Sequence, residues 1–295
     1  MHRSARCRAT APGIALFDQG KFEEALELYE RAIARDDNFA QAHSNRGNAL
    51  QRLKRFADAE PSYRRALELM PSFADAWNNL GTCLRELKRA EEAETVYRKA
   101  LELAPNNPDT LDNLALAVKD LDRLDEAADL MRRALVIEAR SDKFHVHYAT
   151  ILLDQKKVDD ASAAADRALA LDPNNHDAVN LMGRVAFERG ELEASLAHYR
   201  QALALKPDLA DAYNNMGNVL KELGKLDEAH TAYLDALRLV ARYCRRLRQP
   251  CRFKEIRSGR SASRRHGATR GVSRRTFEDR SHAARFRSRQ GLRRP

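Results

Sequence analysis

A period of about 34 residues runs through most of this chain and restricts its possible folds more than any other feature. The stretch WNNLG, at Trp77–Gly81, returns as YNNMG at Tyr213–Gly217, four periods further along the chain. Short units that recur at a fixed period predict an array in which each unit packs on its neighbours. Alignment gives one weak unit and then six full ones, at about residues 6–39, 40–73, 74–107, 108–141, 142–175, 176–209 and 210–243.

The pattern inside each unit predicts two helices joined by a polar turn. In the unit that begins at Ala74, Trp77, Leu80 and Leu84 have the i, i+3, i+7 spacing of one helix face, and a second apolar set follows the polar stretch ELKRAEE. Position 8 of the unit is Gly or Ala, position 20 is Ala or Ser, and position 27 is Ala in all seven units. These small residues allow two helix backbones to approach closely. Position 24 is Tyr in five units, and a Pro at position 32 of four units separates one unit from the next.

This pattern resembles the tetratricopeptide repeat over about residues 13–242. The resemblance implies an all-α fold, a right-handed superhelical solenoid of helix-turn-helix hairpins, which we place at residues 13–243. The first helix of each unit is then expected to line a concave face. We expect residues 1–12 to be disordered, and residues 244–295 to form a disordered, arginine-rich tail.

Asparagines recur in one register of the first helix of each unit. Asparagine is a poor helix former, so its recurrence needs another reason. A side-chain amide can donate and accept hydrogen bonds, so a row of amides can hold an extended peptide backbone. The motifs NNLG, NNMG and SNRGN resemble the asparagine ladder of the O-GlcNAc transferase superhelix, which implies peptide binding, although His147 and Leu181 interrupt the register. The predicted concave-face residues are Asn45, Asn48, Asn79, Asn113, His147, Asn215, Asn218, Asp75, Asp109 and Asp211.

The aspartates of this set, at position 2, add acidic selectivity in this interpretation. The alternative is that all these polar side chains are solvated residues inherited by repeat duplication. Replacement of Asn79, Asn113 and Asn215 by Ala distinguishes the two, because only the first interpretation expects weaker peptide binding.

No catalytic or cofactor-binding motif stands in the chain, so we expect a non-catalytic protein without cofactor, metal or small-molecule substrate. His145 and His147 are two positions apart and point in different directions on a helix. Cys83 occupies a position suited to a small buried side chain. The four cysteines are scattered, which favours a reducing compartment, and no apolar run is long enough to span a membrane. We therefore expect a cytoplasmic protein that binds a peptide or another protein.

The charge of the chain divides at about Cys244. The whole chain has a net charge of +9, but residues 244–295 carry 18 basic and 3 acidic residues, so the preceding residues have a net charge of −6. One interpretation is a nucleic-acid-binding arm in which Phe253, Phe277 and Phe286 stack on bases.

We favour a second interpretation of this segment, a shifted reading frame. The basic residues are 17 Arg and only Lys254, as expected for a GC-rich gene read out of frame. Nucleic acid is then the less favoured partner. Because similar bacterial arrays often precede a glycosyltransferase or sulfotransferase domain, a third hypothesis is the substrate-targeting portion of a truncated transferase.

Overall fold

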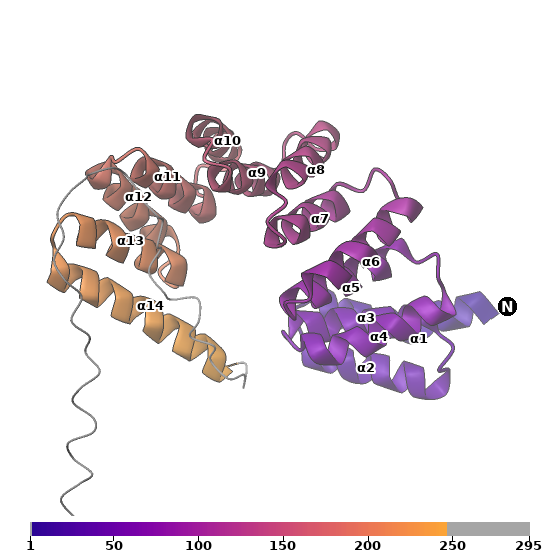
Figure 1. Ribbon diagram of the computed structural model, residues 1–295. Coiled ribbons are helices and arrows are strands. Elements are labelled where there is room, and N and C mark those ends of the chain that lie inside the picture. The colour runs from indigo at the N-terminus through magenta and orange to yellow at the C-terminus, as the bar shows by residue number, and fades with distance from the viewer. Residues whose placement is uncertain (1, 247–295) are drawn as a thin grey trace, which may run out of the picture. The chain divides into compact units, whose positions relative to one another are not determined.

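The computed structural model describes the backbone of residues 2–246 and the side chains of residues 10–242. In this part of the chain there are fourteen helices and no strand (Figure 1). The predicted all-α helical solenoid is confirmed. Residues 247–295, which contain most of the segment attributed to an arm or a shifted frame, lie outside the described residues.

Odd-numbered helices are the first helices of the hairpins. From α3 onward each begins one repeat length after the previous one, so the sequence period is also the structural period. They are α1 (His2–Asp18), α3 (Ala40–Arg52), α5 (Ala74–Glu86), α7 (Pro108–Asp120), α9 (Asp142–Asp154), α11 (His176–Glu188) and α13 (Ala210–Glu222).

Even-numbered helices are the second helices, and their first residues keep the same spacing. They are α2 (Phe22–Arg35), α4 (Phe56–Leu69), α6 (Ala90–Leu103), α8 (Leu124–Ile137), α10 (Val158–Leu171), α12 (Leu192–Leu205) and α14 (Leu226–Arg246).

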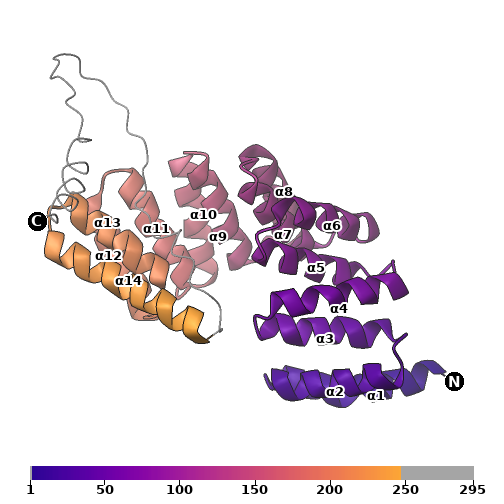
Figure 2. The same cartoon turned by 60° about the horizontal axis from the view of Figure 1, so that its bottom comes forward.

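Successive hairpins stack in chain order, as Figure 2 shows. Each second helix packs against its own first helix and against the first helix of the next hairpin. First helices of neighbouring hairpins also contact each other, whereas in the described part of the chain the backbones of neighbouring second helices stay apart. We call the surface of the first helices, α3 to α13, the inner face, and the surface of the second helices the outer face.

The N-terminal hairpin is more complete than the sequence pattern suggests. Residues 1–12 are expected to be disordered, but the backbone of α1 is helical from His2 onward. No Gly or Pro precedes Pro12, and residues 2–11 are mostly Ala and Arg, which favour a helix. Gly13 of α1 lies against the ring of Tyr29, as in the later hairpins.

A glycine–tyrosine contact holds the two helices of a hairpin together. A Cβ atom built on Gly81 would lie 2.5 Å from Cε1 of Tyr97, and one built on Gly47 would lie 2.7 Å from Cε1 of Tyr63. The same contact joins Gly13 to Tyr29, Gly183 to Tyr199 and Gly217 to Tyr233. The ring therefore packs directly on the backbone of the first helix at position 8, where only glycine leaves enough space for it.

Where position 8 is not glycine, position 24 is not tyrosine. Ala115 is paired in sequence with Met131, and Ala149 with Ala165, and all four side chains are fully buried. The Ala115–Met131 pair has about the same total volume as a Gly–Tyr pair, as close-packed interiors require, whereas Ala149–Ala165 is a smaller pair. The alanines at positions 20 and 27, which are buried throughout the described hairpins, let the helices approach on either side of this pair.

The turn inside each hairpin contains one residue in the left-handed region, always at position 15. Gly20, Gly190 and Gly224 occupy it in three hairpins. A lysine or aspartate adopts it in the other four, with φ between 61° and 65°, at a cost that glycine avoids. In each case the following residue donates its backbone N–H to a carbonyl in the last turn of the first helix, as Arg89 does to Leu84 (2.9 Å). The hydrogen bond closes that helix end.

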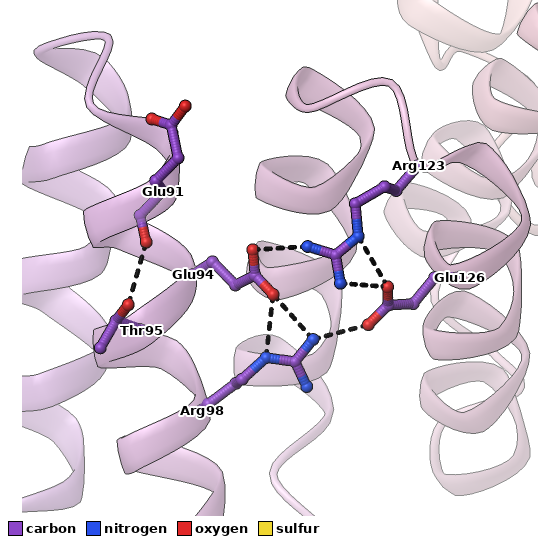
Figure 3. A network of polar contacts seen from close by, with 6 residues as sticks. All are labelled: Glu91, Glu94, Thr95, Arg98, Arg123 and Glu126. Atoms are coloured by element: carbon purple, nitrogen blue, oxygen red, sulfur yellow. Dashed lines mark hydrogen bonds and ion pairs between the residues drawn. The ribbon is translucent and has the colours of Figure 1, made fainter.

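Two rings of ion pairs join consecutive hairpins on the outer face. Glu94 of α6 accepts hydrogen bonds from Arg98 Nη2 and Arg123 Nη1, both at 2.8 Å, and both arginines also bind Glu126 of α8 (Figure 3). A ring of the same residue types at the same positions joins α4 to α6, through Glu60, Arg64, Arg89 and Glu92. The rings stop at α8, because Ala128 stands where Glu60 and Glu94 stand in the earlier hairpins.

Gly81→Ala tests the glycine–tyrosine contact. We expect the free energy of unfolding to fall by about 1–3 kcal/mol, because the new methyl group overlaps the buried ring of Tyr97. The loss should appear even though alanine is intrinsically the better helix former by about 1 kcal/mol. Urea unfolding followed by circular dichroism measures it.

The matched control for this variant is already present in the chain. Gly81→Ala combined with Tyr97→Met reproduces the Ala115–Met131 pair, so the alanine should be neutral or stabilising when Met stands at position 97. A double-mutant cycle with no coupling between positions 81 and 97 contradicts the proposed contact.

The ion-pair rings predict a loss of stability in acid. Burial alone raises the pKa of the Glu126 carboxyl, but the hydrogen bonds from Arg98 and Arg123 outweigh it and hold the pKa below its ordinary 4.5. A lowered pKa in the folded state gives stability above the ordinary value, which is lost as the pH falls below 4.5 through the folded pKa. Thermal melts between about pH 6 and pH 3 should show a shallower fall for Glu126→Gln than for the parent chain. An identical pH dependence of the two proteins counts against the ring.

Candidate functional site

Asparagines on the inner face connect neighbouring hairpins. Asn79 Nδ2 donates a hydrogen bond to Oδ1 of Asn48, one hairpin earlier (3.0 Å). Asn113 Nδ2 donates to Oδ1 of Asn78 over the same distance. The register predicted to hold a peptide therefore lies where first helices meet, and part of its hydrogen-bonding capacity is used between hairpins.

Asn48 and Asn218 also have partners inside their own hairpins. The hydroxyl of Tyr63 donates to Asn48 Oδ1 (2.7 Å), and that of Tyr233 donates to Asn218 Oδ1 (2.8 Å). Burial raises the pKa of both tyrosines, so the hydroxyls remain protonated donors. The asparagine at position 9 therefore accepts a hydrogen bond from the hydroxyl of the ring that packs on the glycine. The oxygen of Asn48 also accepts from Asn79, so both of its acceptor sites are used.

A buried carboxylate replaces the amide at one point of the inner face. Asp112 is fully buried, and its Oδ1 lies 2.6 Å from Nδ1 of His147 in the next hairpin. Lys143 Nζ lies 2.9 Å from the other oxygen and 3.4 Å from Oδ1 of Asp109. Burial alone lowers the pKa of Lys143, but the two carboxylates outweigh it and raise the pKa above its ordinary value. The group is thus a charged contact between hairpins.

His145 and His147 face different surroundings, as their spacing predicts. Nε2 of His145 lies 3.0 Å from the carbonyl oxygen of Ala139, in the turn that precedes α9, whereas His147 contacts Asp112. In the part of the chain that the structure describes, no group of three or more His, Cys, Asp or Glu side chains is arranged to hold a metal ion.

The remaining members of the predicted set differ in exposure. Asn45 is buried, and its Oδ1 accepts from Gln41 Nε2 (3.1 Å) while its Nδ2 has no partner. Asp75 and Asp211 are exposed, and no ion pair with another described residue involves them. Asp109 is paired with Lys143, so acidic selectivity at that hairpin is neutralised by the chain itself.

Amides without a hydrogen-bond partner among the described residues lie on α11 and α13, the last two of the first helices. Asn180 of α11 and Asn214 and Asn215 of α13 are half-buried, and their side chains make no hydrogen bond to another described residue. Oδ1 of Asn180 is buried without a partner, although Asn180 and Asn215 occupy the positions that are bonded in the Asn78–Asn113 pair. Since α11 and α13 contact each other, these amides form one unsatisfied polar surface, which we call the amide cluster.

Cys83 is a core residue, as its position predicts. Its side chain is fully buried, and burial together with the nearby carboxylates of Glu60 and Glu86 raises the pKa of the thiol to about 12. The thiol is therefore protonated at neutral pH and packs as a small apolar group.

Asp112 is not among the residues predicted from the sequence, although it departs from the repeat pattern at its position. Position 5 is Asn in three other units and becomes Asp only here. In the following unit, position 2 changes from Asp to Lys143 and position 6 changes from Asn to His147. The acid and its two basic partners thus depart from the repeat pattern together.

Family comparisons agree with the repeat assignment. Models described as "Tetratricopeptide repeat" match residues 45–108, 120–185 and 210–243, and a model described as "TPR repeat" matches residues 13–54 and 183–224. No curated protein matches the chain. In the described residues no helix combines the length and the apolar character needed to cross a membrane.

Several solved structures share the fold. A tetratricopeptide repeat protein from Parabacteroides merdae is 16% identical with a TM-score of 0.69, over 80% of this chain and 93% of that one. PilW, a type IV pilus biogenesis factor, is 20% identical with a TM-score of 0.65, over 73% and 98%. PilF of Pseudomonas aeruginosa is 23% identical with a TM-score of 0.60, over 70% and 93%.

Two alanine variants should separate amides that join hairpins from amides that are free. Asn113→Ala removes a hydrogen bond and leaves Asn78 Oδ1 unpaired, so we expect the free energy of unfolding to fall by about 0.5–1.5 kcal/mol. Asn215→Ala, at the same unit position, removes no hydrogen bond and should leave stability unchanged or slightly raised. Urea unfolding measures both, and equal losses contradict the distinction.

Proposed function

Because the chain belongs to the tetratricopeptide repeat family, we propose that it is a non-catalytic scaffold that binds an extended peptide or protein segment on its inner face. The observation that carries this proposal is the amide cluster of Asn180, Asn214 and Asn215, whose hydrogen-bonding groups have no partner in the described chain. The proposed binding site therefore lies on α11 and α13, the last two first helices.

The chemistry of the cluster fits a peptide backbone. Each amide offers an acceptor and two donors, which are complementary to the N–H and C=O groups of an extended chain. The buried Oδ1 of Asn180 needs a donor, because a buried polar atom without one costs about 1–3 kcal/mol. Binding that turns this amide toward the peptide gives its oxygen an N–H donor and removes that cost.

Charge near the cluster favours a peptide with a basic residue. Asp177 and Asp211, at position 2 of the same helices, are exposed. Asp211 has no ion pair with a described residue, and Asp177 contacts only the neighbouring His176, at 3.0 Å. The nearby Arg184 is paired with Asp154 of α9 (3.1 Å), so it does not neutralise these carboxylates.

Asn214→Ala combined with Asn215→Ala tests the proposal. An array of extended peptides identifies a bound sequence, and fluorescence anisotropy with that peptide measures its dissociation constant. Loss of two hydrogen bonds of about 0.5–1.5 kcal/mol each should weaken binding about tenfold, with an unchanged helical circular dichroism spectrum.

Asn174→Ala is the matched control, because it removes an exposed amide from the turn between α10 and α11, which carries no member of the amide cluster. It should leave the affinity unchanged. Undiminished binding to the double variant would place the peptide elsewhere and refute the amide cluster as its site.

A further inference from the structure

The outer face changes character at α8. At the C-terminal ends of α8 and α10, position 29 is apolar and exposed, with 85% of Val136 accessible to solvent. It adjoins the exposed apolar residue that position 30 carries in α6 to α12, which is Ile137 (45%) in α8 and Leu171 (39%) in α10. In α4 and α6 the residues at position 29 are Glu68 and Glu102. Exposed apolar side chains that adjoin one another mark interaction sites more often than isolated ones do.

Two grooves flank α8, because the backbones of neighbouring second helices in the described chain stay apart. The groove on the side of the α6–α7 turn has a volume of about 430 Å³ and is lined by Asn106, Asp129, Arg132, Arg133, Val136 and Ile137. The groove on the side of α10 has a volume of about 350 Å³ and is lined by Leu135, Ala139, His145, Arg167, Ala170 and Leu171. Together they offer two apolar recesses on either side of one helix.

At position 26, the basic side chains beside these grooves make no ion pair with a described residue, whereas the basic side chains at the same position of α4 and α6 do. Position 26 carries a cation in α4, α6, α8 and α10. In α4 Arg65 binds Glu68 (3.1 Å), and in α6 Lys99 binds Glu102 (2.5 Å). In α8 and α10 the acid at position 29 is replaced by Val136 and Ala170.

Arg133 and Arg167 therefore make no ion pair with a described residue, and both are exposed. The replacement that exposes an apolar side chain thus also frees a positive charge next to it.

From this coupling we infer that the grooves beside α8 and α10 form a second interaction surface, which binds an amphipathic peptide segment with apolar and acidic residues. The apolar side chains enter the two grooves, and the carboxylates pair with Arg133 and Arg167. An acidic residue of the partner then takes the place of Glu68 and Glu102 in the earlier hairpins. This surface lies on second helices and is separate from the amide cluster.

Charge and shape argue against two other occupants. A second copy of the chain in a two-fold contact places the same patch on both sides, which sets unpaired arginines against each other. A bilayer surface is attracted by arginine and by exposed valine, but it cannot follow recesses that lie between diverging helices. A peptide can fill both recesses and supply both carboxylates.

A charge-swap experiment with the full chain tests the inference. The probes are three dye-labelled peptides of equal length with the same leucines on one helix face and with Glu, Lys or Gln at all other positions. We expect the Glu peptide to bind at least tenfold more tightly than the Lys peptide in fluorescence anisotropy. Arg133→Glu combined with Arg167→Glu should greatly reduce that preference.

Val136→Glu rebuilds the ion pair that α4 and α6 already have, so it should not disturb the fold. It should weaken binding of the Glu peptide about tenfold. Ala204→Glu is the matched control, since it lies at the same position of α12, where Gln201 replaces the cation. Attraction of the Glu peptide by residues 244–295 is the same in all variants, so differences among variants report on α8 and α10.

Three outcomes overturn the inference. They are equal binding of the three peptides to the parent chain, a preference for the Glu peptide that the Arg133 and Arg167 changes do not diminish, and no peptide binding together with sedimentation of the protein with phosphatidylserine vesicles. The last outcome assigns the patch to a membrane surface. None of the three bears on the amide cluster, whose own variants leave this patch unchanged.

Discussion

The packing of a tyrosine ring on the backbone of the facing helix is the contact on which five of the described hairpins depend. Because the ring in these hairpins occupies the space of a Cβ atom at position 8, the distance between the two helices is set by glycine, and larger residues are excluded there. The same ring presents its hydroxyl to position 9, so one side chain joins the core to the polar inner face. Hairpins of constant geometry can then stack with a constant period, which is what makes the array regular.

Periodicity made the helices and the core predictable, but not every local feature. Recurring small residues and a recurring tyrosine identify the buried face, since burial constrains residue size in every unit. The left-handed residue at position 15 gave no such signal, because Lys54, Lys88, Asp122 and Lys156 adopt it without glycine. Its conformation is imposed by the closing of the first helix rather than by the residue itself.

The candidate site could be predicted as a surface but not as a set of free groups. The register of asparagines picks out side chains that meet between neighbouring first helices, because position within a helix determines direction. Whether an amide is free depends on residues in the adjacent unit, such as Asn78 for Asn113 and Asp112 for His147. A single unit contains no information on these partners. The joint departure of Asp112, Lys143 and His147 from the pattern shows that comparison of adjacent units does contain it.

Binding specificity in such an array arises at positions where neighbouring units differ, because the positions that all units share form the core. The side chain at position 29 contacts solvent, so Glu102 and Val136 can occupy it in adjacent hairpins without any change in helix geometry. The exchange nevertheless removes a local ion pair, frees Arg133 and exposes an apolar group in one step. On the inner face, the change from paired to free amides between α7 and α13 works in the same way. A stack of nearly identical hairpins can therefore carry two independent recognition surfaces, since each needs only a few substitutions at positions that the fold does not use.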